Sequence, residues 1–128
     1  MNSGFAVLPN QILINDINQT IIQYQYNLNV EYSNITMRWN TSITDCSNMF
    51  NSLNIIKIDF SGFDSSKVTR MRKMFFNCTS LTSVDLSHFN TSACTDMNAM
   101  FDDCHSLISI DLSNFDTSHV ICFIKIII

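Results

Sequence analysis

Residues 78–92 read CTSLTSVDLSHFNTS, and residues 104–118 read CHSLISIDLSNFDTS. The two stretches are copies of one pattern, which begins first at Cys78 and again at Cys104. The same offset aligns the longer segments 68–93 and 94–119, so that apolar, acidic and hydroxyl side chains recur together. The recurrence of a whole pattern at one fixed offset indicates a repeat protein.

Further copies flank this pair. Residues 43–67 align with it once one residue is deleted near Leu53, residues 35–42 form a weaker copy, and Val120 begins another. The sequence therefore predicts that the chain divides into three segments. Residues 1–34 form an N-terminal segment, residues 35–120 hold about three to four repeats of roughly 26 residues, and residues 121–128 form an apolar, truncated repeat.

Each repeat divides into two halves. In the first half, apolar residues such as Met71, Met74 and Phe75 recur at three and four residues, which predicts a short helix or helical turn. In the second half, Val84 and Leu86 alternate with polar residues, which predicts a strand with one buried face. The NTS or DTS that follows predicts a corner held by side-chain bonds to the backbone.

One repeat cannot cover its own apolar face, so copies must stack to form a continuous core. The predicted repeat core consists of Met49, Phe50, Ile58, Phe60, Phe63, Met71, Met74, Phe75, Cys78, Leu81, Val84, Leu86, Phe89, Met97, Met100, Phe101, Cys104, Leu107, Ile110, Leu112 and Phe115.

The pattern MxxMFxxCxSLxSxDLSxFxTS resembles the BspA-like leucine-rich repeat, a family found in bacterial surface proteins and expanded in parasitic protozoa. The residues that carry the match are Met71, Met74, Phe75, Cys78, Leu81, Val84, Asp85, Leu86, Phe89, Thr91 and Ser92, together with their counterparts in the next repeat. The resemblance implies a short α/β leucine-rich-repeat solenoid, with one parallel strand per repeat and short helical turns. It also implies a cell-surface adhesion protein that binds other proteins, without catalytic residues.

The N-terminal segment has its own pattern. Residues 22–32 alternate apolar and polar side chains, which predicts a strand with one buried face. Because the first repeat of a stack needs a cover, we expect residues 1–34 to form an N-terminal strand cap. A tyrosine-rich binding strip is the alternative.

The five cysteines fit no CxxC spacing. Cys78 and Cys104 occupy the same apolar position in adjacent repeats, which predicts a ladder of buried thiols. A disulfide between adjacent coils is the alternative, because neighbouring strands lie close enough to be bridged. The three histidines share no ligand spacing with the cysteines, so neither a zinc site nor any cofactor is expected.

Two charged columns follow from stacking. Asp59, Asp85 and Asp111 should lie in register on the strand side, where like charges need to be offset. We expect hydrogen bonds to backbone or serine, with Lys57 diagonal to Asp85. The alternative is that these carboxylates bind calcium. On the opposite side, the aligned residues Asp45, Arg70 and Asp96 predict ion pairs between repeats. The predicted partner-binding strand face consists of Lys57, Asp59, Ser83, Asp85, Ser87, Ser109, Asp111 and Ser113.

Composition limits the function. The net charge of −4 argues against a nucleic-acid partner, and no apolar run reaches the ~18 residues of a membrane span. No catalytic motif stands out, so we do not expect an enzyme. The N-terminus lacks the features of a signal peptide, which favours the cytoplasm, whereas the resemblance favours the cell surface.

The sequence as a whole predicts a non-enzymatic module that recognises a protein or a glycan through its strand face. One alternative is an intracellular scaffold that uses the same face. The other is a truncated remnant of a longer repeat gene without independent activity. The apolar residues ICFIKIII at 121–128 support this last alternative and predict self-association through an uncapped C-terminal end.

Overall fold

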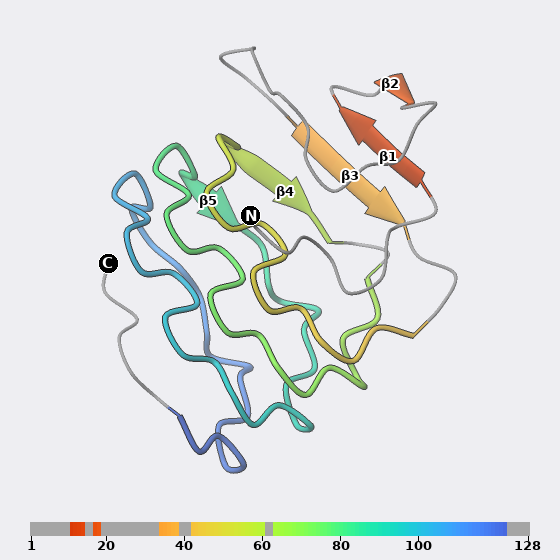
Figure 1. Ribbon diagram of the computed structural model, residues 1–128, viewed down its shortest axis with the longest axis vertical. Helices are drawn as coiled ribbons and strands as arrows, with labels where there is room; N and C mark the ends of the chain where they lie inside the picture. Colours follow the sequence, from red (N-terminus) through yellow and green to blue (C-terminus); the bar gives the residue numbers. More distant parts are fainter. Residues whose placement is uncertain (1–10, 15–16, 19–33, 39–41, 61–62, 123–128) are drawn as a thin grey trace.

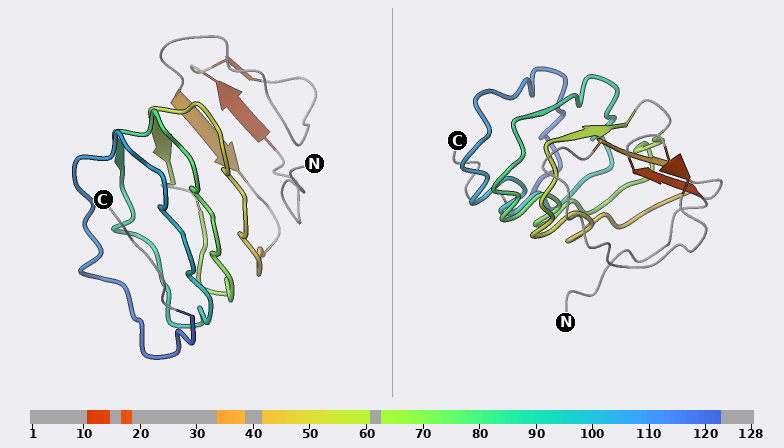
Figure 2. Two further views of the ribbon diagram at one scale, coloured as in Figure 1. Left: turned by 60° about the vertical axis from the view of Figure 1, so that its left-hand side comes forward. Right: turned by 90° about the horizontal axis from the view of Figure 1, so that it is seen from above.

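The computed structural model describes residues 11–14, 17–18, 34–38, 42–60 and 63–122. Over most of this length the chain winds through coils that lie side by side (Figures 1 and 2). We name them after the repeats: the first coil is residues 43–67, the second 68–93 and the third 94–119. The alternating segment 22–32 lies outside the described residues.

One mixed sheet forms one side of the stack. It contains β1 (Gln11–Ile14), β2 (Ile17–Asn18), β3 (Asn34–Arg38), β4 (Lys57–Asp59) and β5 (Ser83–Val84), in the order β2-β1-β3-β4-β5. The strands β3, β4 and β5 are parallel, with Ile35 opposite Ile58 and Ile58 opposite Val84. The weak copy at residues 35–42 therefore adds its strand to the same parallel array as the clear repeats.

The N-terminal end of the sheet changes direction. Strand β1 pairs antiparallel with β3, and β2 pairs antiparallel with β1. Strands β1 and β2 thus lie on the outer side of β3, at the N-terminal end of the stack (Figure 2). This is the end at which the sequence predicts a cap, although the strand proposed for it, at residues 22–32, is not among those described.

A ladder of backbone hydrogen bonds joins the coils on the side opposite the sheet. In the first and second coils, every second amide of the first half donates to a carbonyl of the next coil, at 2.8–2.9 Å. From the second coil to the third, the donors are Met71, Lys73, Phe75 and Asn77, and the acceptors are Asp96, Asn98, Met100 and Asp102. The amides between them, such as those of Met74 and Phe76, donate within their own coil to the carbonyl three residues earlier.

The apolar spacing predicts a short helix or a helical turn here, and the ladder leaves the segment as turns. Among the described residues there is no α-helix, and the first half of each coil is a series of turns. An α-helix keeps its amides within one segment, so it could not bond the next coil in this way. Each series of turns requires two residues in the left-handed region, with φ of 54–63°: Asn48, Ser52, Lys73, Asn77, Ala99 and Asp103.

The stack encloses a continuous apolar core. The predicted core residues of the first two coils are all buried, as are Met97, Met100, Phe101, Cys104 and Leu107 of the third; Ile110, Leu112 and Phe115 are partly buried. At its centre the rings of Phe50, Phe75 and Phe101 stack in a column. Their centroids are 5.4 and 5.1 Å apart, and the planes are within 9° of parallel. One ring per coil thus forms a continuous aromatic contact through the molecule.

Buried hydroxyls hold the corner that follows each strand. The Oγ of Ser65 accepts from the amide of Asn90 at 2.8 Å and donates to the carbonyl of the same residue at 3.2 Å. One coil further on, Thr91 Oγ1 makes the same pair of bonds with Asp116, at 2.8 and 3.1 Å. Ser65 and Thr91 are the buried polar residues of the described chain, and each satisfies both backbone groups of a residue in the next coil.

We predict that Thr91→Val destabilises the fold by about 1–3 kcal/mol, because a methyl group of the same shape leaves the Asp116 backbone groups without their partner. Thr117 occupies the same position in the third coil but is exposed, so Thr117→Val is the matched control and should change stability by no more than about 0.5 kcal/mol. Urea unfolding of the three proteins measures both values. Equal losses in the two variants would show that the buried hydroxyl column does not hold the coils.

Candidate functional site

The strand face is an exposed polar surface. Lys57, Ser83, Asp85, Ser87, Ser109, Asp111 and Ser113 are all exposed, whereas the alternate residues Ile58, Val84 and Leu86 point into the core. Asp59 lies in β4, opposite Thr36 of β3. The strands β4 and β5 are parallel and in register, with Lys57 opposite Ser83, so each coil adds a row of polar side chains to this face.

The acidic residues of the strand face are held by local hydrogen bonds. The Oδ1 of Asp85 accepts from the amide of Ser87 at 2.9 Å, and the Oδ1 of Asp111 accepts from the amide of Ser113 at 2.9 Å. Bonds from the backbone and side chain of Ser87 lower the pKa of Asp85, and bonds from Ser113 lower the pKa of Asp111. Both carboxylates are therefore ionised at neutral pH and fixed in direction.

Neighbouring side chains further lower the pKa of Asp85. Beyond the bonds from Ser87, the charges of His88 and Lys57 also lower the pKa of Asp85, which fits the diagonal position expected for Lys57. Within the described residues, no three acidic, cysteine or histidine side chains come together in a way that could hold a metal ion. Asp85 and Asp111 are exposed, and each accepts a bond from the serine amide two residues later in its own coil.

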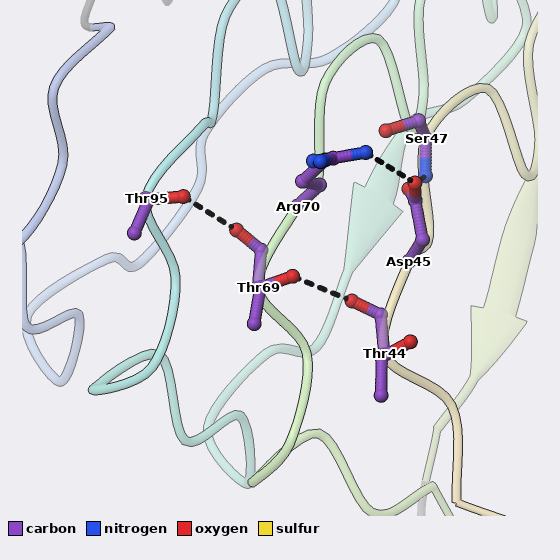
Figure 3. Close-up of polar contacts among 6 residues, drawn as sticks. All are labelled: Thr44, Asp45, Ser47, Thr69, Arg70 and Thr95. Atoms are coloured by element: carbon purple, nitrogen blue, oxygen red, sulfur yellow. Dashed lines mark hydrogen bonds and ion pairs between the residues drawn. The ribbon is translucent and has the colours of Figure 1, made fainter.

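The opposite side of the stack carries the second charged column. Parallel bridges place Asp45, Arg70 and Asp96 in register, and Arg70 Nη1 lies 3.4 Å from Asp45 Oδ2 (Figure 3). Beside it runs a threonine column, in which Thr69 Oγ1 donates to the carbonyl of Thr44 and Thr95 Oγ1 to that of Thr69, at 3.1 and 3.2 Å. An exposed ion pair of this kind contributes ~0.2–1 kcal/mol, so it favours the register more than the stability.

The five cysteines are free thiols, and four of them lie in the core. Cys46, Cys78, Cys94 and Cys104 are buried, and Cys122 is exposed. Cys78 Sγ donates to the carbonyl of Phe50 at 3.0 Å, and Cys104 Sγ donates to that of Phe75 at 2.9 Å, so the same bond recurs in adjacent coils. Burial raises the pKa of both Cys46 and Cys78 to about 12, and these thiols are not nucleophiles at neutral pH.

A third column lies at the corner after the strand, where the sequence predicts side-chain bonds to the backbone. Asp64, Asn90 and Asp116 each accept a bond from the amide two residues later, at 2.9–3.1 Å. Asn90 and Asp116 begin the triplets NTS and DTS, and Asp64 begins the related triplet DSS of the first coil. This column borders the strand face and adds two exposed carboxylates to that end of the molecule.

The geometry defines a class of protein: a stack of short parallel coils with an exposed, regular polar face. A family comparison matches residues 16–127 to the family described as "Mycoplasma protein of unknown function, DUF285", and the chain belongs to this family. Comparisons with curated proteins and with solved structures found no match. No helix in the part of the chain described here is long and apolar enough to cross a membrane.

Acidification should destabilise the fold through the strand-face carboxylates. The pKa values of Asp85 and Asp111 are lower in the folded chain than in the unfolded chain. Their contribution to the stability of the fold is therefore complete above the pKa of the unfolded chain, and it is lost as the pH falls through the pKa of the folded chain. We expect the free energy of unfolding to decrease between about pH 5 and pH 2. Asp85→Asn/Asp111→Asn retains the amide-accepting oxygens but does not titrate there, so urea unfolding should show a smaller decrease. A decrease as steep as in the unsubstituted chain would contradict this assignment.

The thiols should react in two classes. With a thiol reagent at pH 8, we expect one of the five cysteines, Cys122, to react rapidly, because the other four are buried. Cys122→Ser should abolish the rapid phase, and guanidinium should expose the remaining thiols. Rapid reaction of a second thiol in the native protein would mean that the coils open more readily than their packing implies.

Proposed function

We propose that this protein is a non-enzymatic recognition module built as a leucine-rich-repeat solenoid of BspA-like type, and that its strand face binds the partner. The repeated pattern and the parallel, in-register strands β4 and β5 support this proposal. Following the same resemblance, we propose an adhesive role at the cell surface.

The observation that carries the proposal is the state of the strand-face carboxylates. Asp85 and Asp111 are exposed and aimed outward, and the serine two residues later holds each of them ionised. Charged acceptors that recur in adjacent coils of one exposed face suit a ligand that itself presents groups at regular intervals.

The chemistry of the face favours a protein partner with lysine or arginine side chains. Ionised carboxylates form their strongest hydrogen bonds with such cations, and the neighbouring serine hydroxyls can bond to backbone groups. A glycan is the second ligand class that fits, because serine and aspartate also bond to sugar hydroxyls. Nucleic acid does not fit, since phosphates would meet an acidic face on a chain of net charge −4.

Binding can be tested on arrays of lysine- and arginine-containing peptides and of glycans. We expect a subset of basic peptides to bind, with an affinity that decreases as salt increases. Ser83→Arg/Ser109→Arg places two cations on the strand face and should weaken this binding by about tenfold or more.

The matched control is Thr79→Arg/His105→Arg. Thr79 and His105 are also exposed and share one position in adjacent repeats, but they precede the strands, so the control adds arginines beside the strand face and not on it. Binding by the control should remain within about twofold of the unsubstituted chain. Equal weakening in both variants, or no bound ligand on either array, would overturn the proposal.

A further inference from the structure

The strand face carries two carboxylates in the same setting, one coil apart. Asp85 and Asp111 occupy the same position in successive repeats, and both are exposed. The Oδ1 atom of each accepts from the amide of the serine two residues later, at 2.9 Å in both coils. Because the same bond orients both carboxylates relative to their coils, the spacing of the coils sets the distance from one to the next.

The core shows what this spacing is. The phenylalanine rings that form its central column are within 9° of parallel, so the distance between their centroids measures the step from coil to coil. That step is 5.4 Å between Phe50 and Phe75, and 5.1 Å between Phe75 and Phe101. The strand face therefore repeats at slightly more than 5 Å along the stack.

A side-chain contact holds the second and third coils at this spacing beside the two carboxylates. The Nδ2 atom of Asn114 donates to the carbonyl oxygens of Leu86, Ser87 and Phe89, at 3.1 Å in each case. These carbonyls belong to the turn that directly follows Asp85, and Asn114 belongs to the turn that directly follows Asp111. The contact thus fixes one carboxylate relative to the other.

The composition of the strand face limits the backbone conformation of a protein partner. Strand backbones form hydrogen bonds within the plane of a sheet, so the face of the sheet presents side chains. A peptide that binds as an added strand needs the free backbone groups of an edge, and a polyproline segment needs a groove lined by aromatic residues. The residues that define the strand face are lysine, aspartate and serine, which provide neither. A helix bonds its own backbone groups and meets such a surface through its side chains alone.

An α-helix also has the repeat that the face requires. One turn rises by about 5.4 Å, and the coils of this molecule are 5.4 and 5.1 Å apart. A helix that lies along the stack therefore places one turn over each coil. In an extended segment the side chains on one face are about 6.4–6.8 Å apart, so they move out of step with the coils by roughly 1 Å or more at each row.

We propose that the partner of the strand face presents a basic α-helix, an assignment that rests on the function proposed above. The helix lies along the stack, and lysine or arginine side chains on two successive turns face Asp85 and Asp111. Arginine pairs with a carboxylate through two parallel hydrogen bonds, which require a defined position as well as the right charge. Lys57 occupies the first coil of this face and directs the cations to the second and third coils.

Peptides of one composition test this proposal. One carries arginines at i, i+3, i+4 and i+7, which share one face of a helix over two turns. The second has the same arginines spread around a helix of equal helix content by circular dichroism. We expect the first to bind the full chain about tenfold or more tightly than the second in fluorescence anisotropy. A proline at the centre of the first peptide breaks its helix, keeps its charge and should remove this advantage.

Variants of the chain locate the contact. Asp85→Asn/Asp111→Asn keeps the amide-accepting oxygens but removes both charges, so it should bind the two helical peptides equally. The matched control is Asp45→Asn/Asp96→Asn, on the opposite side of the stack. There Oδ1 of each aspartate also accepts from the amide two residues later, at 2.8 and 3.0 Å. The control should keep the full preference for the one-faced peptide.

The outcomes separate this proposal from the one on which it rests. Equal binding of the two helical peptides by the unsubstituted chain, or equal loss of preference in both variants, would overturn the helix and leave a basic partner in place. If none of these peptides and no other basic peptide bound, the function proposed above would be overturned together with the helix.

Discussion

The hydrogen-bond ladder between coils is the constraint on which the rest of the structure depends. Every second amide on the turn side is committed to the next coil, so each coil must return to the same place after a fixed number of residues. The spacing is 25 residues where Asn77 bonds to Ser52, and 26 where Ser80 bonds to Asn54. The change occurs beside Leu53, where the sequence alignment requires its one-residue deletion, and the core positions on both sides of it remain buried.

Fixed spacing converts the repeated sequence into columns of like side chains. The apolar columns form the core. The clearest of them is the stack of the Phe50, Phe75 and Phe101 rings, one from each coil. The same repeat spacing places carboxylates in neighbouring rows, where their like charges repel each other. The protein accommodates them with a serine amide bond at Asp85 and Asp111 and with Lys57 nearby. The candidate site is thus a direct consequence of the stacking and needs no residues from distant parts of the chain.

The sequence predicts which side chains face inward better than it predicts the path of the backbone. Met71, Met74 and Phe75 recur at helical spacing and are buried, yet their segment forms turns, because the spacing does not specify where the amides bond. Left-handed Asn48 and Asp103 are residue types that signal such turns, but Lys73 and Ala99 are not. Likewise, Thr91 and Thr117 stand in nearly identical sequences and differ in burial, because burial depends on the neighbouring coil.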